Sequence, residues 1–221
     1  REVSNKTILR SELELPDIGF VFSCFNNIHK ITPTTFESWM RILKSVDQSV
    51  LWLYANSESV ISNISETASR FGVDNNRIIF ASHAPVEEHL NRIGKADLFL
   101  DTLPYNAHTT ASDALRMGIP VITLIGNSFA SRVAASLLNA VNMPELITST
   151  REQYESLAIE LALNSEKLDS IKNKLAQNLP SSALFDCQTF TNNLELAYDK
   201  MHQKSLSGIN PDHIVVRDLK N

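Results

Sequence analysis

Three short polar segments of this sequence carry the side chains best suited to chemistry, and each of them follows an apolar run. They lie at residues 26–30, 83–92 and 106–113. The first supplies Lys30, and the second supplies His89 and Arg92, which are three residues apart and would share one face of a helix. A lysine and an arginine that meet in one crevice are suited to binding a diphosphate.

The third segment places two threonines, Thr109 and Thr110, close to the expected start of a helix. The first N–H groups of a helix have no partner within it, and together with the helix dipole they favour an anion. Asp113, one turn further on, could accept hydrogen bonds from ribose hydroxyl groups. The three segments together predict a diphosphate site with a place for a ribose.

Each of these residues also has an ordinary structural interpretation. Thr110 and Asp113 fit a capping box, which would explain both without a ligand. His89 and Arg92 could lie on a solvated helix face, and Lys30 could be a surface lysine. The functional interpretation is favoured because all three segments are expected at the same edge of one sheet.

The elements that must position these residues form a regular alternation of apolar runs and amphipathic stretches. Strands are expected at residues 19–25, 50–54, 77–81, 98–100, 121–125 and 146–148. Helices are expected at residues 33–46, 57–71, 86–93, 111–117, 128–141 and from 151 onward. This alternation predicts an α/β fold with a doubly wound, Rossmann-like parallel sheet of five or six strands. In such sheets ligands bind outside the carboxyl ends of the strands.

Local signals mark several helix ends. Thr32 followed by Pro33 is typical of a helix start, and Gly118 sits where a left-handed C-terminal cap belongs. Thr150 and Gln153 fit a capping box for the helix that begins at residue 151. A break in that helix is expected near Asn164.

The chain divides into three expected regions: a connector at residues 1–17, the α/β lobe at 18–180 and a helical tail at 181–221. The tail contains an amphipathic stretch at 186–204, which would leave an apolar face exposed and favour self-association. The sequence begins with Arg1 rather than Met, so we expect a piece of a longer protein.

Composition narrows the class of protein. A hydrophobic content of 43% is ample for a core, and a formal net charge of −5 argues against general nucleic-acid binding. Two cysteines, Cys24 and Cys187, are too few for a disulfide framework and favour a reducing compartment, so we expect a cytoplasmic protein. No apolar run reaches the roughly 18–20 residues that a membrane span needs.

Several familiar sites are missing from the sequence. No G-x-G-x-x-G follows a strand, and neither a G-x-x-x-x-G-K-[ST] phosphate loop nor a G-x-S-x-G nucleophile motif occurs. The histidines lack H-E-x-x-H or Cys/His spacing, so a metal site is not expected. With no dinucleotide motif either, we expect no bound cofactor.

The central stretch DTLPYNAHTTASDALRMGIPVITLIGNSFASRVAASLL closely resembles the C-terminal catalytic lobe of the O-linked N-acetylglucosamine transferases, including bacterial TPR-containing and SPINDLY-like proteins. The resemblance extends from about Leu15 to His213 through FNNIHKITP, SVLWL, NRIIF, APVEEHLNR and PDHI. It implies one lobe of a two-lobed GT-B glycosyltransferase that holds the UDP part of a donor sugar.

Residue by residue, the resemblance implies two groups of contacts. On the diphosphate side, Lys30 would stabilise the leaving group, His108, Thr109 and Thr110 would hold the phosphates, and Asp113 would bind the ribose. On the base side, Ala84 would touch uracil through its backbone, and His89 and Arg92 would line the uridine pocket. Two positions depart from the family: Asn27 stands where glutamine is common, and Val86 replaces a lysine.

The resemblance implies inverting transfer from UDP-N-acetylglucosamine to Ser or Thr of a protein, without a metal. In the family, TPR repeats that bind the protein acceptor and the other lobe precede this segment, so we expect this chain alone to be an inactive fragment. Two alternatives remain: a related protein glycosyltransferase that uses another donor such as GDP-fucose, and a non-catalytic nucleotide-binding or interaction module. The His-Thr-Thr-x-x-Asp pattern favours UDP-N-acetylglucosamine over GDP-fucose.

Overall fold

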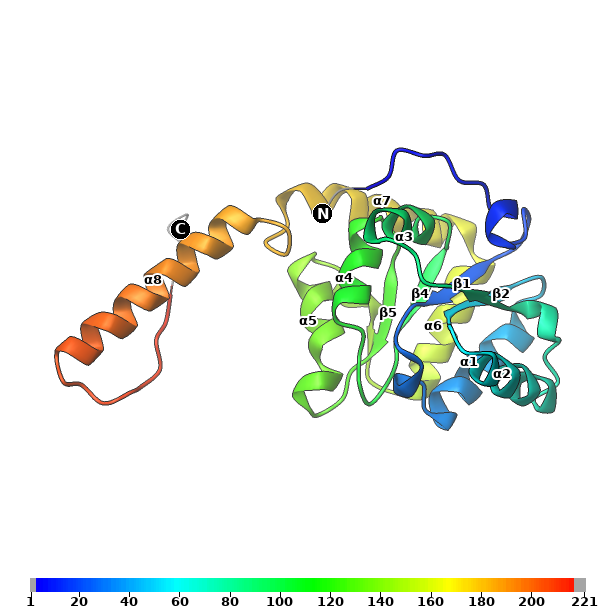
Figure 1. Cartoon of the computed structure of the whole chain (residues 1–221), viewed down its shortest axis with the longest axis horizontal. Coiled ribbons are helices and arrows are strands. Elements are labelled where there is room, and N and C mark those ends of the chain that lie inside the picture. Colours follow the sequence, from blue (N-terminus) through cyan, green and yellow to red (C-terminus); the bar gives the residue numbers. More distant parts are fainter. Residues whose placement is uncertain (1–2, 217–221) are drawn as a thin grey trace.

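The computed structural model describes residues 3–216 and contains one six-stranded parallel sheet (Figure 1). Its strands are β1 (Val21–Cys24), β2 (Val50–Tyr54), β3 (Ile78–Ala81), β4 (Leu98–Leu100), β5 (Val121–Leu124) and β6 (Ile147–Thr148). They lie in the order β3-β2-β1-β4-β5-β6, and every neighbouring pair is parallel. This is the strand order of a doubly wound Rossmann-like sheet, so the predicted fold class is confirmed.

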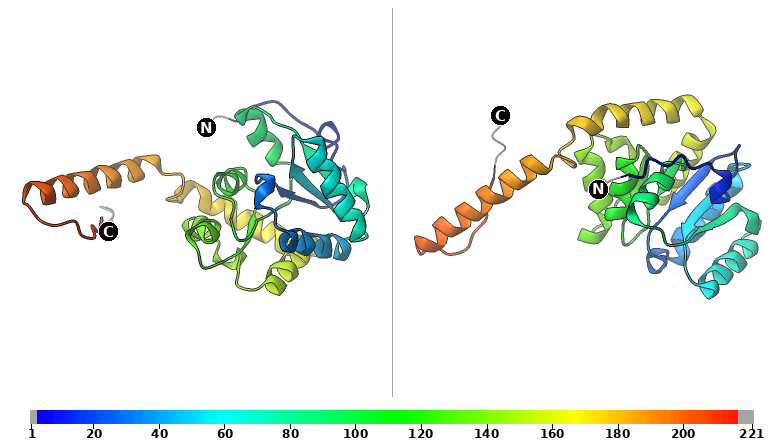
Figure 2. Two further views of the ribbon diagram at one scale, coloured as in Figure 1. Left: turned by 60° about the horizontal axis from the view of Figure 1, so that its bottom comes forward. Right: turned by 45° about the horizontal axis from the view of Figure 1, so that its top comes forward.

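Helices cover both faces of the sheet (Figures 1 and 2). In chain order they are α1 (Pro33–Ser45), α2 (Glu58–Arg70), α3 (Val86–Ile93), α4 (Thr109–Arg116), α5 (Val133–Ala140), α6 (Arg151–Leu163), α7 (Ser165–Asn178) and α8 (Cys187–Leu206). On one face α1 packs against α6, and on the other α3, α4 and α5 form a continuous layer.

The central strands are buried on both sides, which is why they are nearly continuous apolar runs. All four residues of β1 and the first four of β2 are buried. The largest completely buried side chains include Trp39 of α1, Trp52 of β2 and Phe99 of β4. The core therefore lies on both faces of the sheet.

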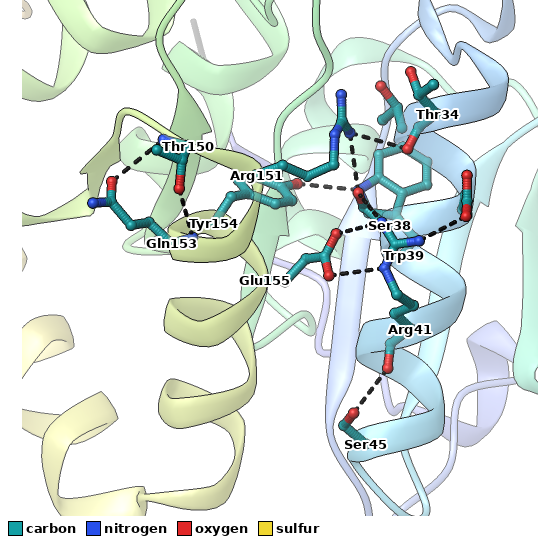
Figure 3. Close-up of polar contacts among 12 residues, drawn as sticks. Thr34, Ser38, Trp39, Arg41, Ser45, Thr150, Arg151, Gln153, Tyr154 and Glu155 are labelled. Carbon is teal, nitrogen blue, oxygen red and sulfur yellow. Dashed lines mark hydrogen bonds and ion pairs between the residues drawn. The ribbon is translucent and has the colours of Figure 1, made fainter.

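The helix ends follow the signals in the sequence. The Thr32 side chain accepts from the Thr35 amide, with Pro33 at the first helical position of α1. Gly118 has a φ of +75°, the left-handed conformation predicted after α4. Thr150 and Gln153 form both halves of a capping box at α6 (Figure 3), and a break at Asn164 separates α6 from α7. These four predictions are confirmed.

Helix α6 returns across the sheet and is fastened to α1 by polar contacts (Figure 3). Arg41 makes a two-point contact with Glu155, through Nε at 2.9 Å and Nη2 at 2.7 Å. Arg151 donates to the backbone carbonyl of Thr34 at 3.0 Å. Deeper in the interface, the Trp39 indole donates to the Tyr154 hydroxyl at 3.1 Å.

Several predicted helices differ from the structure by one residue or two at an end, and two of them differ in a way that has a structural reason. The helix predicted at 111–117 begins at Thr109, two residues earlier. The single helix predicted at 128–141 is a 3₁₀ turn at Phe129–Ser131 followed by α5. The split arises because Ser128 and Ser131 close a capping box around one tight turn, after which Arg132 leaves helical geometry with φ −122° and ψ −7°.

The segments at the two ends of the described chain differ in how closely they pack against the lobe. Within residues 3–17, Arg10 donates to the carbonyl of Gly19 and pairs with Asp97, and Leu15 joins the core, so this expected connector lies against the sheet. Helix α8 projects away from the lobe and has no buried residue (Figures 1 and 2). No helix in the described part of the chain is long and apolar enough to cross a membrane.

Candidate functional site

The three predicted segments follow β1, β3 and β4, and they meet the carboxyl edge of the sheet as expected. Strands β1 and β4 are neighbours at the centre of the sheet, where the chain reverses its direction of winding. Loops diverge at such a switch point, and the crevice between them is where ligands bind in open α/β sheets. The candidate site therefore lies where topology alone would place it.

One part of the site is an aromatic pocket of about 200 Å³, lined by Phe25, Tyr54, His83, Ala84, His89 and Arg92. The Arg92 side chain contacts several of the residues that form this pocket. Its guanidinium donates to the Ser82 carbonyl at 2.8 Å and to Nδ1 of His89 at 3.2 Å, and lies 5.5 Å from the centre of the Phe25 ring. Burial lowers the pKa of Arg92 from its ordinary value. Aromatic faces beside fixed hydrogen-bonding groups are suited to a nucleobase.

A second part of the site surrounds Lys30, which lies in a 3₁₀ turn (Ile28–Lys30) after β1. Its Nζ donates to the carbonyl of Asn106 at 3.0 Å and lies 3.8 Å from the centre of the Tyr105 ring. Burial lowers the pKa of Lys30, an effect opposed by the charge of Asp101. The ammonium is thus held by two contacts from the loop after β4.

The start of α4 lies beside this lysine. His108 is the residue before the helix, and its ring contacts Tyr105 and Phe129 at centroid distances of 5.0 and 6.4 Å. Among the described residues, the buried Nε2 of His108 has no hydrogen-bond partner. Thr109 is exposed at the first helical position. A helix start with unpaired N–H groups beside a lysine is suited to an anion.

The capping-box interpretation of Thr110 and Asp113 is wrong. His108 occupies the cap position without a side-chain cap bond. The Thr110 hydroxyl instead donates to Oδ1 of Asn26 at 2.5 Å. Asp113 is buried, with 7% of its surface exposed, and it does not line the aromatic pocket.

Asp101 directly follows β4 and holds the loop that carries Asn106, whose carbonyl accepts from Lys30. Its carboxylate accepts from the Ala107 amide at 2.5 Å, the Thr102 amide at 2.8 Å and the Thr123 hydroxyl at 2.7 Å. Burial raises the pKa of Asp101 to about 7, against the opposing effect of these hydrogen bonds. Its backbone carbonyl accepts from Tyr154 at 3.0 Å, which links the site to α6.

The structure brings most of the predicted residues together in these two groups. Ala84, His89 and Arg92 line the aromatic pocket, whereas Lys30, His108, Thr109 and Thr110 surround the start of α4. Phe25 lines the pocket and the adjacent Asn26 contacts Thr110, so the two groups adjoin. Val86 opens α3 and Asn27 precedes the 3₁₀ turn; both are exposed, and neither lines the pocket.

Sequence reasoning missed the aromatic members of the site. Phe25 and Tyr54 end apolar runs and were assigned to strands, and Tyr105 and Phe129 were assigned no role. Their position at the carboxyl ends of strands, or in the loops beyond, is the signal that could have identified them. No group of three or more His, Cys, Asp or Glu side chains suited to a metal ion occurs within residues 3–216.

The fold and the arrangement of loops at its switch point define this chain as a Rossmann-like α/β domain. Comparison with known sequences makes the assignment specific. The model of glycosyl transferase family 41 matches residues 1–194, and the chain belongs to this family. The resemblance stated from the sequence motifs is thereby confirmed.

Two similar proteins are named as transferases of the same kind. The chain is 37% identical over 215 residues to the UDP-N-acetylglucosamine–peptide N-acetylglucosaminyltransferase of Caenorhabditis elegans, over 96% of this chain and 19% of that protein. It is 38% identical over 208 residues to the probable enzyme SEC of Arabidopsis thaliana, over 94% of this chain and 21% of that protein. The chain therefore spans about a fifth of the length of these relatives.

A solved structure supports the same relationship. The O-GlcNAc transferase of Thermobaculum terrenum, in a K341M mutant form, superposes with a TM-score of 0.81 at 32% identity. The match covers 86% of this chain and 37% of that one.

Proposed function

We propose that this chain is the donor-binding lobe of a protein O-GlcNAc transferase, holding UDP-N-acetylglucosamine while its sugar is transferred to Ser or Thr. The observation that carries the proposal is the convergence of Lys30 and the start of α4 beside an aromatic pocket at the β1/β4 switch point. This arrangement offers positively charged groups that can bind a diphosphate and an aromatic pocket that can bind a nucleobase. The names of the relatives support the choice of UDP-N-acetylglucosamine.

The chemistry that these residues would perform is stabilisation of the leaving group. In inverting transfer, the acceptor hydroxyl oxygen bonds to the anomeric carbon as the bond from that carbon to the UDP oxygen breaks, and the hydroxyl proton passes to the departing diphosphate or to solvent. Negative charge then grows on the diphosphate, where Lys30 and the N–H groups of α4 would meet it. Such a site needs no metal, because the ammonium and the helix start supply the positive charge.

Other parts of the parent protein would complete the enzyme. An acceptor hydroxyl must be held in attack geometry, and we assign that task to preceding TPR repeats and a second catalytic lobe. Helix α8 presents Phe190, Leu194, Tyr198 and Met201 to solvent, at spacings that place them along one side of the helix. In the parent protein, this stripe would pack against a neighbouring lobe. In the isolated chain, it would promote self-association. We expect the parent protein to act in the cytoplasm.

Base selectivity provides a first test of the donor. We expect the 221-residue chain to bind UDP at least about tenfold more tightly than GDP, a difference of about 1.4 kcal/mol. The expected cause is the backbone at Ala84, because a purine would leave buried hydrogen-bonding groups unpaired there. Isothermal titration calorimetry with UDP, GDP and their sugar derivatives measures the difference directly. Equal affinities, or tighter binding of GDP, would favour a fucosyl-type donor instead.

Transfer provides a second test. We expect the chain alone to bind UDP-N-acetylglucosamine without glycosylating a Ser/Thr-rich peptide, and to transfer sugar once the separately expressed preceding part of the parent protein is added. Peptide mass spectrometry after incubation with and without that part gives the comparison. Transfer by the isolated chain would place the acceptor site within these residues. It would contradict the proposal that other parts of the parent protein hold the acceptor.

A further inference from the structure

A buried polar cluster lies beneath the candidate site, and two of its members, Asn26 and Thr102, have no role in the function proposed so far. It consists of Asn26 after β1, Thr102 and Asn106 after β4, and Thr110 in the first turn of α4. Asn26 and Thr102 are each 1% exposed, and Asn106 is completely buried. Asn26 touches both of the other elements, so it is the point at which the three meet.

The hydrogen bonds around Asn26 have a single consistent direction. Its Nδ2 donates to Oγ1 of Thr102 at 2.8 Å, and the one hydroxyl proton of Thr102 is donated to the carbonyl of Tyr105 at 2.6 Å. A reversed amide would place the Asn26 oxygen against a hydroxyl whose proton is already used. The side-chain oxygen of Asn26 must therefore face Thr110, from which it accepts.

This direction has a consequence for the start of α4. The hydroxyl of Thr110 has only one proton, and that proton points inward to Asn26. Thr110 therefore cannot donate its hydroxyl to a bound anion without giving up Asn26. What α4 offers a ligand is its first backbone N–H groups and the exposed Thr109, held in place by the Thr110 anchor.

The same cluster reaches Lys30. The carbonyl of Thr102 accepts from Nδ2 of Asn106 at 2.8 Å, and the carbonyl of Asn106 accepts from Nζ of Lys30 at 3.0 Å. Asn26 and Thr102 thus connect two elements by hydrogen bonds. One is the loop after β4, which contacts the Lys30 ammonium, and the other is α4, which supplies the N–H groups.

We propose that Asn26 is a positioning residue for the diphosphate, fixing the start of α4 relative to Lys30 through Thr110 and Thr102. The inference rests on the proposed donor-binding function and assigns Asn26 a role without any contact with the ligand. It also separates the two neighbouring threonines: Thr110 orients the helix start, and Thr109 faces the ligand.

The test compares UDP with uridine, because only UDP uses the anion site. We expect Asn26→Ala to weaken UDP about tenfold and uridine less than about twofold, measured by calorimetry on the 221-residue chain. Asn178→Ala is the control, because Asn178 is a half-buried asparagine outside the candidate site whose side-chain amide likewise donates to a distant residue, the carbonyl of Val141 at 3.0 Å. It should lower the unfolding temperature without changing the ratio of the two affinities.

Variants of Thr110 test the route through which Asn26 acts. Thr110→Ser keeps the hydroxyl and should retain the UDP/uridine ratio, whereas Thr110→Val should reproduce the loss. The double variant Asn26→Ala/Thr110→Val should bind UDP no more weakly than the worse single variant, because both break one contact. If the Thr110 hydroxyl bound phosphate directly, Asn26→Ala would leave it free to do so, and the two effects would add.

The outcomes separate the two proposals. Failure of the unsubstituted chain to bind UDP would overturn the donor-binding function. UDP binding with an unchanged ratio in Asn26→Ala, or additive effects in the double variant, would overturn the role of Asn26 alone. If Asn26→Ala does not fold, as judged by circular dichroism, the Thr110 pair decides: an unchanged ratio in Thr110→Val then overturns the inference.

Discussion

Replacing Lys30 with alanine is expected to weaken the binding of UDP by roughly 1.5–3 kcal/mol and to leave uridine almost unaffected. The ammonium is already held by the Asn106 carbonyl and the Tyr105 ring, so little ordering is needed when a diphosphate binds. Uridine has no phosphate, so its affinity should depend on the aromatic pocket around Arg92. Calorimetric titration of both ligands into the variant measures each loss separately.

A control for Lys30 is available on the same lobe. Lys44, near the end of α1, is exposed and donates to the backbone carbonyl of Phe71 at 3.2 Å. Lys44→Ala removes the same charge away from the carboxyl edge of the sheet and should leave both affinities unchanged. If Lys30→Ala weakened UDP and uridine equally, Lys30 would support the loop rather than meet the diphosphate.

The second large effect concerns stability and pH. The pKa of Asp101 is raised from 3.8 to about 7 by burial. Between these values the folded chain holds a proton that the unfolded chain has released, so the stability contributed by this group falls as pH rises. The slope approaches about 1.4 kcal/mol per pH unit. Below the lower value and above the higher one, both states carry the same charge and the group adds no pH dependence.

Asp101→Asn isolates this effect, because asparagine is similar in size but does not titrate. We expect urea unfolding at a series of pH values to show the unsubstituted chain losing stability relative to the variant from about pH 4 to 7. The difference should be constant at higher pH. Parallel stability curves for the two proteins across this range would mean that the Asp101 carboxylate is charged throughout, sustained by its three hydrogen-bond donors.

The parts of the fold that could be predicted from the sequence are those set by local patterns. Strand β2 has the predicted bounds because a run of five apolar residues has no competing interpretation. The capping box at Thr150 and the break at Asn164 depend on neighbouring residues only. The convergence of three loops at one sheet edge followed from parallel topology rather than from any individual residue.

The parts that could not be predicted depend on contacts between distant residues. Asn26 and Thr102 are 76 positions apart, and nothing in the sequence near either one reveals that they are paired. Thr110 matched a local capping motif, but the buried amide of Asn26 competes for its hydroxyl. In the same way, Asp101 directly follows the strand predicted at 98–100, and its network with Thr123 and Tyr154 required the sheet to be assembled.

The contact between α6 and α1 has a consequence for the order in which the protein acquires its structure during synthesis. Trp39 and its partner Tyr154 are separated by 115 positions, and Tyr154 also supports the backbone of Asp101 beneath the site. At translation rates of about 5–20 residues per second, Tyr154 leaves the ribosome roughly 6–23 s after Trp39. For that interval Trp39 is outside the ribosome without α6, the helix against which α1 packs. The loop that carries Asn106, whose carbonyl accepts from Lys30, is therefore among the last parts of the lobe to reach its final structure.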